Sequence, residues 1–482
     1  MTDALRRLGA ALERAEYTVD GVRTLLGPVA GGALARDEIV PALRASGGGS
    51  PLETLLRLFW LQVPVAGGGL VDELVAAGFA EVSGDEVRAR LRVEPVEGDG
   101  HVGYAVSDLR VRPGSGGTVR PDHVVGTGGA SASLARLAVH SPVDNVLDVG
   151  TGCGVQALHL AGRAGRITAT DVNPRALELA ALSAGLSGVG EVEFLEGSLL
   201  EPVAGRRFDL IVSNPPFVVA PPGPRYVYRE SGLPGDEFCR RLVVEAPRLL
   251  NEGGQCRFLA NWLQVKGVPW EERVGGWIEE SGCDAWVVQR DVQDPAEYAE
   301  LWLRDSAEAG TPEYRRRYDA WLDHFERHDV TGIGFGWIAL RTPAGGRPAT
   351  RIEELRHAVE EPVGAYVARI LDGFTGARNF STACGKSLRA VAGLVQEQIG
   401  PPGAEDPERI VLRQRDRLRR AAGVGTVEAA LAGVCDGSLP LEPLLDAIAQ
   451  LMGLDQAEVW AHAEAVLPEL IADGFFEFAP EG

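Results

Sequence analysis

Runs of apolar residues alternate with amphipathic segments through the middle of the chain, from about residue 100 to 345. Five of these runs look like buried strands, and helical segments separate the first four. This alternation predicts an α/β fold with a doubly wound, mostly parallel sheet. Two later runs, at 284–292 and 332–342, extend it to a Rossmann-like sheet of seven strands, with a helical insertion between them at about 294–329. The five first runs are VDNVLDVG, GRITATDV, EVEFLEG, FDLIVSNPP and GQCRFLANW.

The two flanks of this region have a different pattern, in which short helical segments predominate. Residues 1–98 are predicted to form a helical domain that ends in a hairpin, with its turn at 83–85. Residues 346–482 are predicted to be mainly helical as well, and their 466–478 segment repeats the helix–glycine–strand ending. We therefore predict three domains, with the sheet domain at 99–345, and a winged-helix character for both flanks.

Length and charge narrow the classes of partner. The chain has 482 residues, too many for one ordinary core, and a formal net charge of −21. A charge of that sign repels polyanions at long range, so it disfavours a protein that coats nucleic acid, although a local arginine patch can still grip RNA. The arginines of 315–317 and 413–420 are candidates for such a patch. Acidic residues on nearby turns favour a solvated helix face instead.

The N-terminal segment, the length of the apolar runs and the cysteines together predict the cellular compartment of the protein. The N-terminal segment is amphipathic without the apolar centre of a signal peptide, and no apolar run is long enough to span a bilayer. The six cysteines are scattered without a C-x-x-C pair, which fits reduced thiols better than disulfides or a zinc site. We expect a cytoplasmic protein with no membrane association and no metal site.

A glycine-rich turn follows the first strand of the predicted sheet. Its glycines permit a tight turn and let a ligand approach the backbone, near the positive end of the helix that begins there. A purely structural turn explains such a motif about equally well when it stands alone. The turn reads Asp148-Val149-Gly150-Thr151-Gly152-Cys153-Gly154.

The ends of the next two strands favour a nucleoside site. Asp171, followed by Val172, ends the second strand, where a carboxylate can accept hydrogen bonds from ribose hydroxyls. Ser198 and Leu199 follow the third strand, where an adenine can be gripped. Three successive strand ends with nucleoside-binding chemistry are hard to explain as turns alone.

The spacing of the glycines separates two classes of cofactor. A dinucleotide favours the longer G-x-G-x-x-G pattern, whereas this chain has G-x-G-x-G with Asp148 two positions before the first glycine. An acidic residue there has no obvious use beside a pyrophosphate, but it suits a positively charged methionine moiety. Over residues 146–260 the pattern resembles class I S-adenosylmethionine-dependent methyltransferases, with the motifs in the family order.

That resemblance assigns a role to each strand end. It implies the class I methyltransferase fold, with S-adenosyl-L-methionine as the cofactor. Asp171 and Val172 would lie at its ribose, and Ser198 and Leu199 would flank its adenine. The residues expected around its methionine part are Asp148, Gly150, Thr151, Gly152 and Gly154.

The tetrapeptide Asn214-Pro215-Pro216-Phe217 follows the fourth strand, where its two prolines force the chain out of the sheet. In isolation it reads as a strand-ending turn. In this fold it matches the [ND]-P-P-[YFW] motif of methyltransferases that act on planar nitrogens of glutamine, adenine or guanine. The resemblance implies that Asn214 and the Pro215 carbonyl accept the two N–H protons of that nitrogen, while Phe217 stacks on its flat group.

The residues after the tetrapeptide favour one acceptor. A Tyr-Arg-Glu turn at 228–230, Gly-Leu-Pro-Gly-Asp at 232–236, a helix and Leu-Asn-Glu-Gly-Gly at 250–254 resemble the release-factor glutamine methyltransferases. A protein glutamine is therefore the expected substrate. An amino group of a ribosomal or transfer RNA base is the alternative, and a small-molecule nitrogen is a lesser one. The long C-terminal extension departs from that family, and the oligomeric state and any need for an activating partner protein stay open.

One more segment, residues 122–131, lies just before the first strand and is rich in glycine. The resemblance implies a lid over the cofactor, with Thr127 or Ser131 placed to reach its carboxylate; a plain flexible loop explains the composition equally well. His123 is interpreted as structural, and Cys153 as a small residue that fills a tight turn.

Overall fold

The computed structural model separates the chain into two compact units. The first comprises 1–281, 287–338 and 352–354, and the second comprises 282–286, 339–351 and 355–482. The predicted division into three domains at residues 98 and 345 stays a prediction. No helix within the described residues is both long and apolar enough to cross a membrane. The structure describes residues 2–97, 102–111, 119–138, 141–221, 232–305, 312–382, 385–402 and 407–479.

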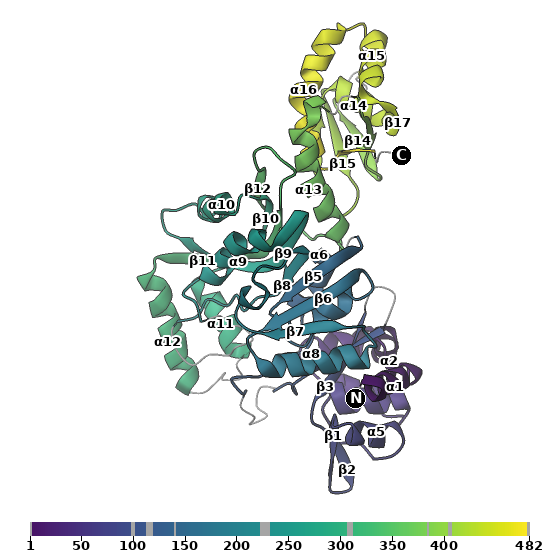
Figure 1. Ribbon diagram of the computed structural model, residues 1–482, viewed down its shortest axis with the longest axis vertical. Coiled ribbons are helices and arrows are strands. Elements are labelled where there is room, and N and C mark those ends of the chain that lie inside the picture. The colour runs from purple at the N-terminus through teal and green to yellow at the C-terminus, as the bar shows by residue number, and fades with distance from the viewer. Residues whose placement is uncertain are drawn as a thin grey trace. The chain divides into compact units, whose positions relative to one another are not determined.

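An eight-stranded sheet is the central element of the fold (Figure 1), with the strand order β12-β10-β11-β9-β8-β5-β6-β7. The strands β7, β6, β5, β8 and β9 pair in parallel, so the predicted Rossmann-like sheet is confirmed. The sheet has one strand more than predicted, because the short edge strand β12 has the sequence TRIEE without an apolar run. The strands are β5 Val143–Val149, β6 Ala164–Asp171, β7 Val192–Glu196, β8 Phe208–Ser213, β9 Leu250–Val265, β10 Asp284–Gln293, β11 Val330–Arg341 and β12 Thr350–Glu354.

Helices connect the parallel strands and cover their apolar side chains. Strands buried on both faces read as continuous apolar runs, and Val146, Leu147 and Val212 are accordingly fully buried. Asn173 begins α8 by accepting a hydrogen bond from the Arg175 N–H at 3.1 Å, and this N-cap fixes how the chain leaves β6. The helices are α6 Gly129–Ala138, α7 Val155–Leu160, α8 Pro174–Leu186, α9 Glu237–Glu245 and α10 Trp270–Ser281, with the short 3-10 turns Glu201–Val203 and Ala246–Leu249.

The N-terminal module, which we define as residues 2–97 and 102–108, belongs to the same compact unit as the parallel strands. Its α1 packs on α8 so closely that a side chain at Gly9 would meet the Leu186 carbonyl oxygen at 1.8 Å. The predicted hairpin is confirmed, since β1 and β2 pair in antiparallel register. The elements are α1 Thr2–Arg14, α2 Val19–Leu34, α3 Val40–Ala45, α4 Pro51–Leu55, the π-helix Leu56–Trp60, α5 Leu70–Ala76, β1 Ala80–Ser83, β2 Glu86–Ala89, β3 Arg92–Glu97 and β4 Val102–Ser107.

The predicted helical insertion before β11 is confirmed as α11 Pro295–Asp305 and α12 Pro312–Arg327. Tyr298, Trp321 and Phe325 from these helices are buried in one cluster with Val218 and Val219, which directly follow the tetrapeptide. The Tyr298 hydroxyl also accepts a hydrogen bond from the Val219 N–H at 3.0 Å. The insertion therefore holds the chain segment that leaves β8.

The second unit is less helical than predicted, because it contains two three-stranded sheets, β17-β13-β18 and β14-β15-β16. Arg413 lies on β15 and pairs with Glu397 on β14 at 2.7 Å, so the interpretation of 413–420 as a helix face is wrong. Strands this short have too few apolar residues to be recognised by periodicity, and even the mostly buried β15 has only three in a row. The predicted ending is confirmed, as Gly474 (φ 73°) joins α16 to β18. The elements are α13 Gly364–Arg378, the 3-10 turn Phe380–Thr382, β13 Ser387–Ala390, β14 Leu394–Ile399, β15 Arg409–Gln414, β16 Ala421–Val424, α14 Thr426–Val434, β17 Asp436–Pro440, α15 Leu441–Met452, α16 Gln456–Ala472 and β18 Phe476–Phe478.

Candidate functional site

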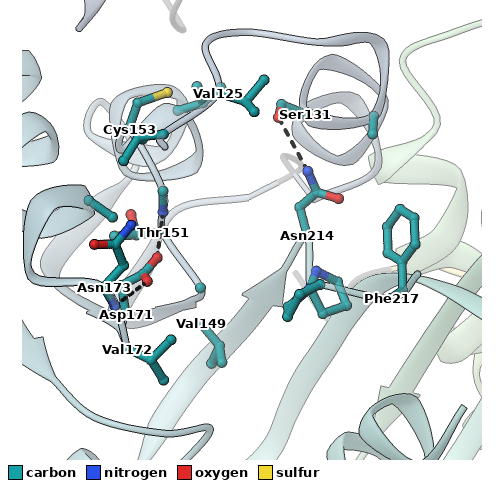
Figure 2. Close-up of a pocket in the computed structure, with 18 of the residues that line it drawn as sticks. Val125, Ser131, Val149, Thr151, Cys153, Asp171, Val172, Asn173, Asn214 and Phe217 are labelled. Atoms are coloured by element: carbon teal, nitrogen blue, oxygen red, sulfur yellow. Dashed lines mark hydrogen bonds between the residues drawn. The ribbon is translucent and has the colours of Figure 1, made fainter. Parts of the chain in front are cut away.

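A cavity of about 740 Å³ lies at the carboxyl ends of the parallel strands (Figure 2). Ligands bind at this edge in open α/β sheets, because the loops that follow the strands converge there. The loops after β5, β6, β7 and β8 all contribute to its wall, as the sequence predicts. Residues 123–126 and 128–131, Phe238 on α9 and Trp302 on α11 also line it.

The glycine-rich turn after β5 needs its glycines for two different reasons. Gly150, Gly152 and Gly154 have φ of 71°, 56° and 85°, in the left-handed region that other residues avoid. Gly150 and Gly152 line the cavity, so a ligand can lie against their backbone. Gly154 lies away from it and lets α8 approach, since a Cβ there would be 3.2 Å from the Ala180 Cβ.

Asp148 is buried beneath the turn and is not part of the cavity wall. Its carboxylate accepts a hydrogen bond from the Thr151 hydroxyl at 2.6 Å, and Thr151 itself lines the cavity. Burial raises the pKa of Asp148 to about 7. The structure therefore places this carboxylate behind Thr151, where it orients the turn, instead of in direct reach of a bound amino group.

The raised pKa of Asp148 predicts a pH-dependent stability. The folded state holds the proton more tightly than the unfolded state, so the Asp148 contribution weakens as pH rises from about 4 through about 7. Asp148→Asn removes this titration. We expect the wild type to lose stability relative to the variant, on the order of 1–3 kcal/mol, between pH 5 and pH 8. Melting temperatures of both proteins at the two pH values measure this change in stability. The same difference in melting temperature between the two proteins at both pH values would contradict the prediction.

Asp171 ends β6 with its carboxylate held in place by backbone donors. Its two oxygens accept hydrogen bonds from the Gly152 N–H and the Asn173 N–H, each at 2.9 Å (Figure 2). Burial raises the pKa of this carboxyl, while the backbone hydrogen bonds oppose the shift. Each carboxylate oxygen keeps acceptor capacity for a ligand hydroxyl. Val172 beside it is 50% exposed and presents an apolar face on the cavity wall.

Ser198 and Leu199, predicted at the adenine, both line the cavity after β7. The chain turns sharply there, since Gly197 has φ 153° and Leu199 has φ 49°. A Cβ at Gly197 would lie 2.5 Å from Cγ of Pro202. The turn thus places a polar residue and an apolar residue side by side at the same edge as Asp171.

All four residues of the tetrapeptide after β8 line the cavity. The Asn214 amide nitrogen donates to the Ser131 hydroxyl at 3.3 Å (Figure 2), and this contact orients the amide. Asn214 Oδ1 is buried and has no hydrogen-bond partner within the described part of the chain. A buried acceptor without a partner is costly, so it marks a place where a ligand donor belongs. The Pro215 carbonyl accepts the Phe217 N–H at 2.8 Å, which leaves it one further lone pair.

Phe217 faces a second aromatic residue, Trp302, which was not predicted from the sequence. The ring of Trp302 meets that of Phe217 edge to face, with centroids 6.5 Å apart and an interplanar angle of 68°. Trp302 lies 85 positions further along the chain, on the helical insertion. Neither its spacing nor its neighbours carried a signal, because the contact depends on how α11 packs on the sheet.

The segment before the sheet forms part of the cavity wall through residues 123–126 and 128–131, and its role as a lid over the cofactor stays a prediction. Ser131 lines the cavity, whereas Thr127 does not. Cys153 is buried in the turn, and burial raises the pKa of its thiol to about 12, in agreement with a space-filling role. The predicted turn at 228–230 lies outside the described residues.

The sheet order and the four strand-end motifs together define a Rossmann-like class I methyltransferase fold. Residues 128–267 match the family described as Methyltransferase small domain. The resemblance that the motifs predicted is thereby confirmed for this part of the chain. Residues 14–90, within the N-terminal module, match a domain of unknown function, DUF7059.

Several curated proteins are similar to part of the chain. The chain is 36% identical over 168 residues to the release factor glutamine methyltransferase of Geobacter sulfurreducens, covering 32% of this chain and 56% of that protein. It is 40% identical over 146 residues to that of Deinococcus radiodurans, covering 28% and 52%. Ribosomal RNA small subunit methyltransferase C of Cronobacter sakazakii is 33% identical over 177 residues, covering 36% and 46%. The chain therefore spans about half the length of the curated relatives it matches.

One solved structure is similar to this chain at lower sequence identity. The T. thermophilus 16S rRNA N2 G1207 methyltransferase, in complex with AdoMet and guanosine, is 19% identical with a TM-score of 0.29. The match covers 45% of this chain and 57% of that one. The fold assignment stands on the strand order and pairing described above.

Proposed function

We propose that this protein is an S-adenosylmethionine-dependent methyltransferase that methylates a planar nitrogen, with a protein glutamine side chain as its acceptor. The observation that carries the proposal is the buried Oδ1 of Asn214, which borders the cavity beside Phe217 and has no hydrogen-bond partner in the part of the chain that the structure describes. An acceptor oxygen next to an aromatic ring suits a flat amide whose N–H groups need partners.

The residues of the cavity fit the cofactor. Asp171 offers fixed carboxylate oxygens to ribose hydroxyls, and Val172 and Leu199 offer apolar surface to a base. Gly150 and Gly152 leave their backbone open for the amino-acid part. When bound, S-adenosylmethionine supplies a methyl group on a sulfonium centre as the electrophile.

The tetrapeptide orients the nucleophile. An amide nitrogen is a poor nucleophile because its lone pair is delocalised into the carbonyl. Asn214 Oδ1 and the second lone pair of the Pro215 carbonyl accept its two N–H groups, which fixes the direction of the nitrogen lone pair and stabilises the positive charge that develops on it. Phe217 and Trp302 hold the flat group from the side. The extra proton leaves after transfer, so no strong base is required.

The choice of a glutamine acceptor has two supports. The curated relatives include several release factor glutamine methyltransferases and a ribosomal protein uL3 glutamine methyltransferase from Bradyrhizobium diazoefficiens. The net charge of −21 also suits a protein partner better than a polyanion. A macromolecular substrate in the translation apparatus, and a cytoplasmic location with it, are part of this proposal.

An RNA base amino group is the second candidate, favoured by the similarity to ribosomal RNA small subunit methyltransferase C. The same acceptor oxygen and aromatic wall suit the amino group of a flipped base. Release factors, ribosomes and total RNA incubated with the enzyme and tritiated cofactor separate the two. Label on a release factor or ribosomal protein that protease removes and ribonuclease does not is the expected result; the reverse sensitivity would overturn the glutamine acceptor.

Trp302 is expected to act on the acceptor and not on the cofactor. Trp302→Ala removes one wall beside Phe217, so kcat/KM for the acceptor should fall about tenfold, while affinity for S-adenosylhomocysteine stays within about twofold. Trp302→Phe should retain most of the activity. Leu301→Ala is the matched control, because this neighbour on α11 is 43% exposed and lies outside the cavity wall. Equal losses in the 301 and 302 variants would contradict the assignment.

A further inference from the structure

Residues 119–128, which we call the roof segment, border the cavity through His123, Val124, Val125 and Gly126. Two carboxylates hold the backbone of this segment, and the N-terminal module provides both. Glu94 lies on β3, and Asp108 follows directly after β4. Neither residue lines the cavity itself.

Glu94 is a buried carboxylate that binds the backbone of the roof segment. It is 3% exposed, and its Oε2 accepts the Thr127 N–H at 3.0 Å. Its Oε1 accepts from Nη2 of Arg92 at 2.7 Å, and the Arg92 guanidinium lies 5.7 Å from the centre of the Trp60 ring. A buried carboxylate is costly unless its lone pairs are used, so these bonds keep Glu94 in place under the roof segment.

Asp108 holds the roof segment three residues earlier. Its Oδ2 accepts the Val124 N–H at 2.9 Å, and its own N–H donates to the Val124 carbonyl at 3.1 Å. The same carboxylate accepts Nε of Arg175, on α8, at 3.0 Å. His123 Nδ1 lies 3.8 Å from it. The roof segment is therefore tied to the module and to the helix that follows Asp171.

At Gly126 the roof segment packs closely against the N-terminal module. A Cβ at this position would lie 2.2 Å from Oε2 of Glu94 and 2.8 Å from Oγ of Ser107. The backbone of Gly126 is outside the left-handed region, so glycine is needed here for space and not for conformation.

Hydrogen bonds attach the module that carries both carboxylates to the sheet domain. The Tyr104 and Val106 N–H groups of β4 donate to the hydroxyls of Ser187 and Ser183, each at 2.8 Å. The roof segment itself is attached to the sheet domain at Asp122, whose carbonyl accepts a hydrogen bond from the Asn173 side chain at 2.9 Å. The backbone N–H of Asn173 donates to the Asp171 carboxylate. Displacement of the roof segment would thus act directly on the ribose side of the cavity.

We infer that Glu94 and Asp108 are positioning residues through which the N-terminal module holds the roof segment closed over the cofactor and sets how fast the cofactor leaves. The inference rests on the proposed function in so far as the cavity ligand is S-adenosylmethionine. It gives the module a task in the catalytic cycle, through two residues that lie just beyond the stretch 14–90 that matches a domain of unknown function.

Glu94→Ala is the test. In the ligand-free protein, hydrogen exchange of the roof-segment amides should accelerate about tenfold, because Thr127 loses a charge-assisted acceptor. The dissociation rate of S-adenosylhomocysteine should also rise about tenfold, while kcat at saturating cofactor stays within about twofold. Glu94→Gln keeps an acceptor oxygen and should recover most of the difference. Glu81→Ala is the control, since this exposed residue of the same module pairs with Arg90 at the surface hairpin.

Gly126→Ala provides an independent variant, because it presses the roof segment away from Glu94 without changing the module. It should reproduce both effects of Glu94→Ala. Unchanged exchange and unchanged dissociation in these two variants, or equal changes in Glu81→Ala, would overturn the inference. If the wild type binds no S-adenosylhomocysteine, the proposed function fails, and the exchange measurement still decides whether Glu94 holds the roof segment.

Discussion

Asn214→Ala is expected to lower methyl transfer about 10²–10³-fold while the affinity for S-adenosylmethionine stays within a few-fold. The alanine removes the buried Oδ1, which has no hydrogen-bond partner among the described residues and which we propose accepts an N–H of the substrate nitrogen. Loss of one preorganised hydrogen-bonding group at a reacting centre typically costs this much. Single-turnover rates at saturating cofactor, together with calorimetric binding of S-adenosylmethionine, measure the two effects separately.

Asn214→Asp is the matched variant for this position. It keeps an acceptor oxygen at the same distance from the backbone, and the [ND]-P-P-[YFW] motif allows aspartate there. It should therefore transfer methyl groups faster than Asn214→Ala. Unchanged turnover in the alanine variant would refute the role assigned to the tetrapeptide.

Asp171→Ala should act on the cofactor instead, with a loss of affinity of about 10²-fold. The carboxylate is the acceptor proposed for the ribose hydroxyls, and hydrogen bonds to a charged group contribute about 1.5–3 kcal/mol. The variant also frees the Gly152 N–H, so the glycine turn loses one of its anchors. Calorimetric titration with S-adenosylhomocysteine gives the dissociation constant, and activity should return in part at high cofactor concentration.

Asp144→Ala is the control for this measurement. Asp144 is exposed near the start of β5, at the opposite end of the strand from the cavity, and should leave the dissociation constant within about twofold. Wild-type affinity in Asp171→Ala would reject the ribose assignment. Together with the Asn214 variants, this separates defects of cofactor binding from defects of transfer.

Much of the cofactor site was predictable because strand ends in a parallel sheet meet at one edge. Once the apolar runs predicted parallel strands, the residues that end them, among them Asp171, Ser198 and Asn214, were expected at one edge of the sheet although they are far apart along the chain, and all three line the cavity. Asp148 shows the limit of this reasoning. The sequence predicted it in the turn after the first strand, whereas it lies within β5, one residue before the strand ends, and it is buried behind Thr151.

The parts that were missed share a physical cause. The strands β12, β13, β14 and β16 are short and half-exposed, so they lack the apolar runs that reveal a buried strand, and the buried apolar run of β15 is only three residues long. Trp302 and Glu94 act through contacts with residues 85 and 33 positions away, at Phe217 and Thr127. No local periodicity records such a contact, since it arises only when separate elements pack together.

The central parallel sheet and the residues near the ends of its strands therefore followed from the sequence, because apolar periodicity and turn residues act locally and parallel strands share one edge. The tertiary structure alone decided which side chains face the cavity and what holds them there. The Asn214 amide is oriented by Ser131, the Phe217 ring meets Trp302, and the roof segment rests on Glu94. Each of these contacts joins elements whose mutual position is set by packing over the whole unit, and for that reason it has no signature in the chain.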